Sequence, residues 1–145
     1  MKHTIKEIDI EKTFETSFHD LIIRASKNEI VEKLGIKPIY NRSGKTHYDW
    51  SLILDDKFVF TIYDYEEGIL KADDVIEYHI GWKPEFFING EFTNQELDPK
   101  TGFPKRIEVC EMIVALEERG LEVDQAASWK DFYGPNGYFY KIYNK

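Results

Sequence analysis

The residues whose types and spacing could bind phosphate begin with NRSGKT, residues 41–46, which ends in the Gly-Lys-Thr of phosphate-binding loops. A P-loop needs a further glycine five positions before Gly44, where this chain has Ile39, and it runs from a strand into a helix. The residues after Thr46 have the pattern of a strand instead. We therefore reject a P-loop and predict a surface turn before that strand.

A second group of cations lies in PKTGFPKR, residues 99–106, which contains Lys100, Lys105 and Arg106 and no acidic residue. This segment precedes the strongest helical pattern in the chain, and the free N–H groups at a helix start favour an anion. Cations stabilise the opposite end of a helix, so their position here favours an anion site. The alternative is that Lys100 and Lys105 neutralise the acidic segment before them in a solvated loop.

Nucleotide-binding sites commonly combine arginine, aromatic and amide side chains. The sequence has four arginines, an aromatic content of 15% and a polar turn at Asn89-Gly90. For Trp50, Tyr78 and Trp82 the alternative is packing in the core, because they occupy regular strand positions. His79 falls on the opposite face of its strand, so we expect it at the surface or in a pocket.

Other kinds of chemistry find less support. The four histidines are scattered singly, and none has a local His or Cys partner at zinc-ligand spacing, so we predict no metal site. Cys110 lies in an apolar helical stripe and is expected to be buried and inert. Asp49 and Asp64 fall on antiparallel strands and could become neighbours, but solvated carboxylates at strand ends are the preferred interpretation. We predict that the protein is not an enzyme and needs no cofactor.

The composition limits the class of protein. A chain of 145 residues fits one domain, residues 1–145, with an ordinary core. The formal charge of -8 disfavours nonspecific nucleic acid binding, and residues 66–98 are strongly acidic. No run is apolar and long enough for a membrane span, and the first ten residues lack the apolar stretch of a secretory signal. We expect a cytoplasmic protein.

Two helices and several strands must position these residues. Ser26 and Glu29 form a capping box for a helix that Gly35 ends, and residues 104–119 form a second helix that Gly120 ends. HYDWSLIL and KFVFTIYDY, around a tight DDK turn, predict a β-hairpin, and VIEYHIGW predicts a third strand. FFING extends that strand or begins a fourth, and residues 138–143 resemble a C-terminal strand. The predicted fold class is α+β, with an antiparallel meander of about four strands packed by two helices.

The hairpin and the strand after it, YDWSLILDDKFVFTIYDYEEG and EYHIG, resemble a family of small phage-encoded proteins with a Tyr/Trp strand, a TIYDW or TIYDY strand and an HIG strand. The resemblance covers roughly residues 20–82, with the long helix as a looser match. Among phage proteins that act against bacterial defence, the chain is similar to the Thoeris anti-defence sponges. This resemblance implies an oligomer that sequesters a cyclic ADP-ribose-type or cyclic nucleotide signal without cleaving it.

The resemblance also implies ligand roles by residue type and order. Arg24 and Arg106 would hold phosphate, Asn89 a base or ribose edge, and an aromatic near position 82 or 86 would stack. The candidate ligand-binding residues are therefore Arg24, His79, Trp82, Phe86, Asn89, Lys105 and Arg106. The family more commonly has the motif HIGG, whereas this chain has Trp82 after Gly81. The resemblance therefore does not predict the shape of that turn.

The predicted function is thus a non-enzymatic anti-defence protein that sequesters a small nucleotide immune signal, in a pocket at a subunit interface of a homo-oligomer. The alternative is a protein-binding inhibitor whose acidic segment, residues 66–98, mimics nucleic acid against a host defence protein. A third hypothesis is an enzyme that degrades the same nucleotide with Asp49, Asp64 or His79.

Overall fold

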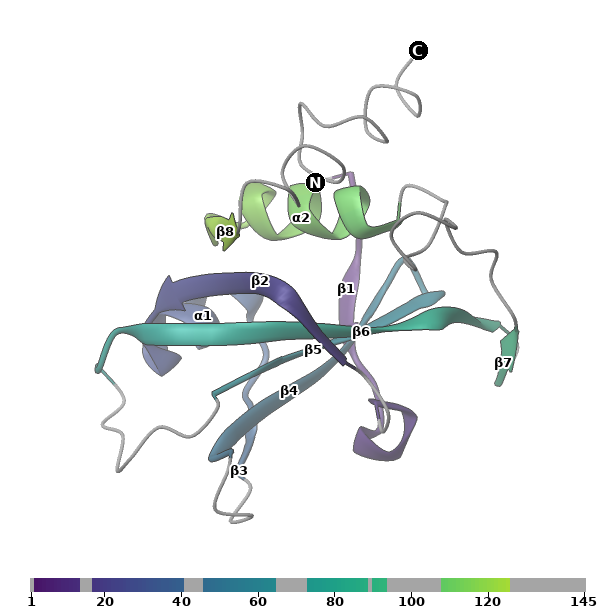
Figure 1. Cartoon of the computed structure of the whole chain (residues 1–145), viewed down its shortest axis with the longest axis horizontal. Coiled ribbons are helices and arrows are strands. Elements are labelled where there is room, and N and C mark those ends of the chain that lie inside the picture. The colour runs from purple at the N-terminus through teal and green to yellow at the C-terminus, as the bar shows by residue number, and fades with distance from the viewer. Residues whose placement is uncertain are drawn as a thin grey trace.

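The computed structural model describes residues 2–13, 17–40, 46–64, 73–88, 90–93 and 108–125. An eight-stranded antiparallel sheet and two α-helices form the fold, which confirms the α+β prediction (Figure 1). The strands are β1 (Ile5–Glu7), β2 (Ser17–Ala25), β3 (Ile39–Tyr40), β4 (Tyr48–Leu54), β5 (Phe58–Tyr63), β6 (Ile76–Ile88), β7 (Glu91–Thr93) and β8 (Val123–Gln125). The helices are α1 (Lys27–Leu34), α2 (Glu108–Glu118) and the short 3-10 helix η1 (Ile10–Thr13).

The sheet is built around the predicted meander of β4, β5 and β6. Its strand order is β1-β4-β5-β6-β2-β8, with β3 also paired to β4 and β7 paired to β6. The turn between β4 and β5 contains Asp55 and Asp56 with φ of 51° and 59°, left-handed values that aspartate tolerates better than most residues. Trp50, Leu52 and Leu54 form a row on β4 that faces Ile62, Phe60 and Phe58 of β5 across the hairpin. All the side chains of both rows are buried.

The long strand β2 lies between β6 and β8, although its sequence did not predict a strand clearly. Its pairing with β6 shifts register between Phe18 and Leu21, so the alternation of apolar residues is broken there. Strand β6 continues to Ile88, which settles that FFI extends the third strand. Pro84 is accommodated because the pairing with β5 also shifts register between Phe58 and Phe60, opposite this part of β6.

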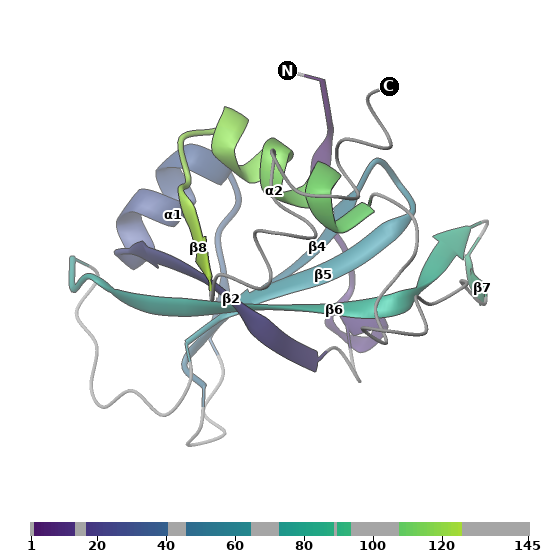
Figure 2. The same cartoon turned by 45° about the horizontal axis from the view of Figure 1, so that its top comes forward.

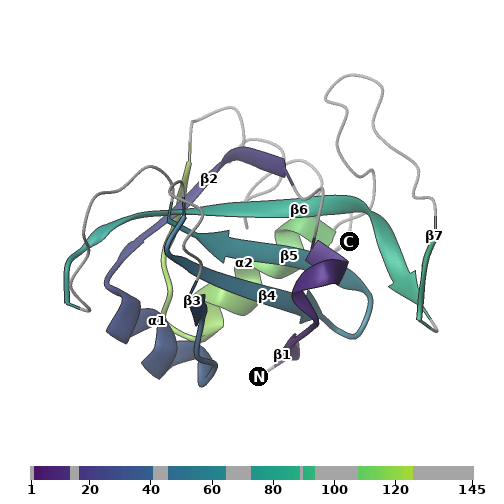
Figure 3. The same ribbon diagram turned by 90° about the horizontal axis from the view of Figure 1, so that it is seen from below.

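Both helices contribute to one hydrophobic core on one face of the sheet, as Figure 2 shows. Ile30 of α1 and the apolar face of α2 pack against the buried row of strand residues. The opposite face carries η1, and Figure 3 shows η1 in front of the strands with α2 behind them. There Thr13 Oγ1 lies 3.1 Å from Ser51 Oγ, a buried hydrogen bond between η1 and β4. Cys110 is buried in the core, as predicted.

Both predicted ends of the first helix and the predicted C-terminal end of the second are observed, whereas the predicted start of the second helix at residue 104 lies outside the described residues. Ser26 is the N-cap of α1, and its hydroxyl accepts a hydrogen bond from the Glu29 N–H at 3.1 Å. Gly35 has φ of 71° and donates its N–H to Val31 O at 2.8 Å. Gly120, with φ of 88°, ends α2. The predicted strand at 138–143 and the turn at 41–44 lie outside the described residues.

Candidate functional site

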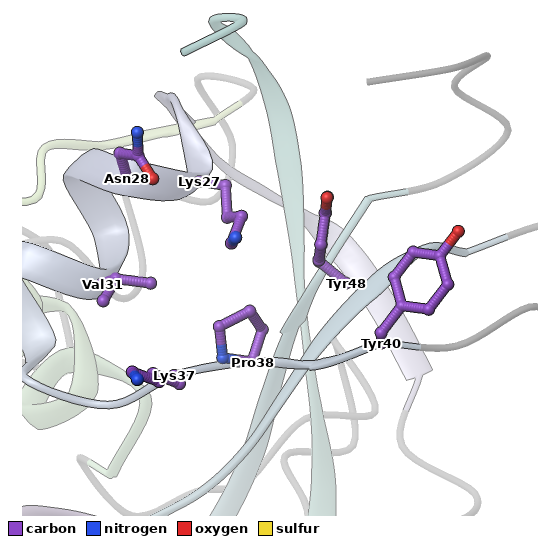
Figure 4. A pocket seen from close by; sticks show the side chains of 7 residues that line it. All are labelled: Lys27, Asn28, Val31, Lys37, Pro38, Tyr40 and Tyr48. Atoms are coloured by element: carbon purple, nitrogen blue, oxygen red, sulfur yellow. The ribbon is translucent and has the colours of Figure 1, made fainter. Parts of the chain in front are cut away.

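A pocket lies between helix α1, the segment that follows it and the start of strand β4. Its volume is 380 Å³, within the range of small-molecule sites. Among the described residues, its walls are cationic, aromatic and apolar, with one amide and no carboxylate. The lining residues are Lys27, Asn28, Val31, Lys37, Pro38, Tyr40 and Tyr48 (Figure 4). This composition suits an anionic ligand that has a flat ring.

The charged and aromatic side chains of the pocket are arranged around its opening. Lys27 Nζ lies 5.0 Å from the centre of the Tyr48 ring, a cation–π contact. Figure 4 shows the Lys27 side chain extending from α1 toward Tyr48. Tyr40 is 55% exposed, and its ring centre lies 5.7 Å from that of Tyr48. Lys27 occupies the first turn of α1, where the helix dipole disfavours a cation, so its position is not explained by helix stability.

The backbone of the pocket is held in place from the core. The indole N–H of Trp50 donates to Ile36 O at 2.9 Å, which fixes the chain between α1 and β3. Trp50 itself is buried and its ring contacts Tyr78 edge-on, with centres 5.6 Å apart. At the helix side, Asn28 Nδ2 donates to Asp73 Oδ1 at 2.8 Å. The walls that carry Lys37 and Tyr40 are thus attached to the sheet and to α1.

Asp64 fixes the start of β4, where Tyr48 enters the pocket. Its side chain is fully buried, which corrects the expectation of a solvated carboxylate at a strand end. Oδ1 accepts the N–H groups of His47 at 2.8 Å and Tyr48 at 2.7 Å, and Oδ2 lies 2.9 Å from His47 Nδ1. These bonds offset the cost of burying the charge. Asp49 instead lies opposite Tyr63 in the hairpin register.

The bond to Asp64 also orients the half-buried ring of His47. A carboxylate accepts, so Nδ1 carries the proton when the imidazole is neutral, and Nε2 is left with its lone pair. The ring centre of His47 lies 6.5 Å from that of Tyr40 in the pocket wall. Among the described residues near the pocket, His47 thus has the geometry that a general base needs.

Arg24 lies on strand β2, and two carboxylates already hold its guanidinium. Nη1 donates to Asp124, and Nη2 donates to Glu77 at 3.1 Å. The hydrogen bond to Asp124 is the largest cause of a raised Arg24 pKa, and the charges of both carboxylates add to it. A phosphate would have to displace these partners, and Arg24 does not line the pocket.

The structure separates the other predicted ligand residues. His79 is half-buried opposite Tyr63, and their rings meet edge-on with centres 5.6 Å apart. Trp82 is 1% exposed and belongs to the core, so its role as a stacking surface for a ligand is corrected in favour of the packing alternative. The backbone of Phe86 is in β6. Asn89, Lys105 and Arg106 lie outside the described residues, so the predicted basic helix start stays a prediction.

Sequence reasoning missed the residues that form the pocket. Tyr48 alternates with the buried residues Trp50, Leu52 and Leu54 of β4, but at the end of that row it is half-buried and reaches the pocket. One sequence signal could have pointed to Lys27, because it is a cation in the first turn of a predicted helix, where a cation does not stabilise the helix. Lys37 follows the end of the same helix. Tyr40 could not be placed without knowing that β3 pairs with β4, where Tyr40 lies opposite Tyr48.

Comparisons of the chain with protein-family models, curated proteins and solved structures gave no match. Within the described residues, neither helix has the length and apolar character needed to cross a membrane. The chemistry of the site therefore has to be argued from its own residues.

Proposed function

We propose that this protein binds a small anionic nucleotide in the pocket beside α1 and sequesters it without cleaving it. One observation carries the proposal: Lys27, Lys37, Tyr40 and Tyr48 line one cavity of about 380 Å³, and no carboxylate is found among its described lining residues. An anion with an aromatic base matches both kinds of side chain. In this proposal the pocket takes the roles first predicted for Arg24 and Trp82, while the predicted site residues Asn89, Lys105 and Arg106 lie outside the described residues.

The residues of the pocket have separate roles in this proposal. Lys27 and Lys37 neutralise the phosphate groups as flexible point charges. Tyr40, the most exposed of the aromatic residues in the wall, stacks on the base, and such stacking contributes about 1–3 kcal/mol per base. Asn28 supplies an amide for a polar edge of the ligand and is itself positioned by Asp73.

The resemblance to the Thoeris anti-defence sponges supports a more specific form of the proposal. In that form the ligand is a cyclic ADP-ribose-type or cyclic nucleotide signal, and the protein is a phage-encoded homo-oligomer. Tyr40 of the pocket wall and its neighbour Ile39 are both exposed on β3, and in this form of the proposal a second subunit closes over the ligand there. Sedimentation of the Tyr40→Ala variant beside the parent protein tests this interface: a shift toward monomer supports it, and an unchanged mass excludes Tyr40 from it.

Equilibrium titration tests ligand binding directly. Cyclic dinucleotides, cyclic mononucleotides, cyclic ADP-ribose isomers and ADP are titrated against the parent protein and against Lys37→Gln and Tyr40→Ala, two exposed positions that should not affect folding. Each substitution should weaken binding by about 10-fold, the loss of one charged or stacking contact. Lys6→Gln removes an equally exposed lysine outside the pocket and should leave binding unchanged. Absence of binding to every nucleotide overturns the proposal.

Recovery of the ligand distinguishes sequestration from catalysis. After denaturation of the complex, the bound nucleotide should have its original mass. If it is cleaved and His47→Asn prevents the cleavage, the protein is an enzyme whose base is oriented by Asp64. The acidic inhibitor has less support among the described residues, because Glu77 is paired with Arg24 and Asp73 accepts from Asn28.

A further inference from the structure

A buried carboxylate outside the pocket lacks a hydrogen-bond donor among the residues that the structure describes. Glu111 lies on α2 and is 5% exposed, and among the described residues no N–H or side chain donates a hydrogen bond to it. A buried carboxylate is costly unless a donor or a cation offsets its charge. The neighbouring residue types decide what can supply that positive charge.

His3 and Asp55 direct their side chains to the same point. His3 is 6% exposed, and its Nδ1 lies 2.7 Å from Asp55 Oδ2. One ligand atom of each of these two residues and one carboxylate oxygen of Glu111 all lie within 4.8 Å of one another. The cluster therefore brings one imidazole nitrogen and two carboxylate oxygens together in a buried space.

Backbone contacts hold the three groups in place. Thr4 exchanges bonds with the turn, because its N–H donates to Asp55 Oδ1 at 2.9 Å and its carbonyl accepts the Asp55 N–H at 3.0 Å. Arg119 Nη2 donates to the carbonyl of His3 at 2.8 Å, while its Nη1 donates to Ala115 O. The N-terminal segment is thus attached to both the β4–β5 turn and α2, and the ligand atoms are positioned before any ion arrives.

We propose that His3, Asp55 and Glu111 form a binding site for a divalent transition-metal ion, of which Zn²⁺ is the best fit. Zinc takes imidazole nitrogen and carboxylate oxygen at about 2.0–2.2 Å, and three protein ligands leave a fourth position for water. The ligands are few and include an imidazole nitrogen, so Ca²⁺, which takes six to eight oxygens, fits poorly. The ion neutralises Glu111 and joins the N-terminal segment, the turn and α2.

The position of the ligands explains why their sequence gave no sign of a metal site. Positions 3, 55 and 111 have no local spacing, and the zinc patterns that can be read from sequence depend on local pairs. The site lies apart from the nucleotide pocket, since none of the three residues lines it. Its proposed role is structural, and it does not depend on the proposed function.

Metal titration of the full chain, freed of affinity tags and treated with chelator, tests the site. Calorimetry with Zn²⁺ should give one ion per chain with a Kd below about 10 µM, and the melting temperature should rise with free Zn²⁺. Co²⁺ should give the intense visible absorption of a four-coordinate site. Mg²⁺ and Ca²⁺ should produce no comparable shift.

Variants then assign the ligands. Glu111→Gln and His3→Asn should each weaken Zn²⁺ binding by at least about 10-fold and remove the thermal shift. Glu118→Gln makes the same change seven residues later on the same helix, at an exposed position, and should bind Zn²⁺ like the parent protein. Without metal, Glu111→Gln should melt no lower than the parent, because it removes a buried charge.

The titration of the parent protein decides the proposal even if a variant does not fold. If no saturable Zn²⁺ binding occurs, the proposal is wrong. Binding that persists unchanged in both Glu111→Gln and His3→Asn also overturns it, because the ion then sits elsewhere.

Discussion

Asp64 provides the sharpest test of how the start of β4 is held. The Asp64→Ala substitution removes the acceptor of two backbone N–H groups, those of His47 and Tyr48, and of the His47 ring. Hydrogen bonds to a charged group contribute about 1.5–3 kcal/mol each, so a simple sum would exceed 4 kcal/mol. His47 is 23% exposed, so water can reach part of the vacated site and recover some of this energy. We expect a loss of about 3–5 kcal/mol in the free energy of unfolding.

The Asp64→Asn substitution removes the charge of this side chain but keeps its shape. Its amide oxygen still accepts both backbone N–H groups, and its NH₂ can donate to His47 Nδ1 once the imidazole adopts the other tautomer. The expected loss is about 1–2 kcal/mol, well below that of Asp64→Ala. Because Tyr48 follows His47 into the pocket, Asp64→Ala should also weaken nucleotide binding more than Asp64→Asn does.

Urea denaturation followed by tryptophan fluorescence measures both losses. The slope of the free energy against urea should be unchanged if only the native contacts are lost. Glu32→Ala, at an exposed position of α1, serves as the control and should fall within about 0.5 kcal/mol of the parent. If Asp64→Ala loses less than about 1 kcal/mol, or if it equals Asp64→Asn, the account of Asp64 as the anchor of this segment is refuted.

Three further predictions follow from other contacts. Gly35→Ala should lower stability in urea by about 1 kcal/mol, because φ is 71° and no atom lies within 4 Å of the added carbon, so only backbone strain contributes. Arg24→Ala breaks exposed ion pairs with Glu77 and Asp124 and should lower stability in urea only slightly, with the difference shrinking at high salt. Burial acts to raise the pKa of Asp55, but hydrogen bonds from Thr4 and His3 lower it overall from 3.8. In chelator, its contribution to stability should therefore be present above that value and lost as the pH falls through the lower native pKa, and Asp55→Asn should flatten this acid dependence.

The strands whose side chains alternate regularly were predictable from sequence. Trp50, Leu52 and Leu54 alternate along β4 and all belong to the hydrophobic core, so pattern and structure agree. Strand β2 was not predictable in the same way, because its register shift lies inside the strand. The length of strand β6 was underestimated because a proline such as Pro84 normally ends a strand. Only the irregular pairing with β5 shows how the strand accommodates this proline.

The candidate sites depend on contacts between distant segments, which one-dimensional patterns do not contain. Tyr40 and Tyr48 come together only because β3 folds back on β4. Asp64 was expected at the surface because it follows the last residue of β5, yet the chain before β4 returns to cover it. Trp82 was expected to stack on a ligand, but its side chain is buried in the core. Residue type predicted the chemistry better than it predicted the location.

Strand β6 has a consequence for how the native state opens. From Tyr78 to Trp82 it pairs with β2 on one side, and over most of the same residues it pairs with β5 on the other. Breaking it therefore separates the hairpin half of the molecule from the half that contains β2 and β8. Amide hydrogens at the centre of β6, such as that of Ile80, should exchange with solvent only when the whole described fold unravels, and so report the global unfolding free energy.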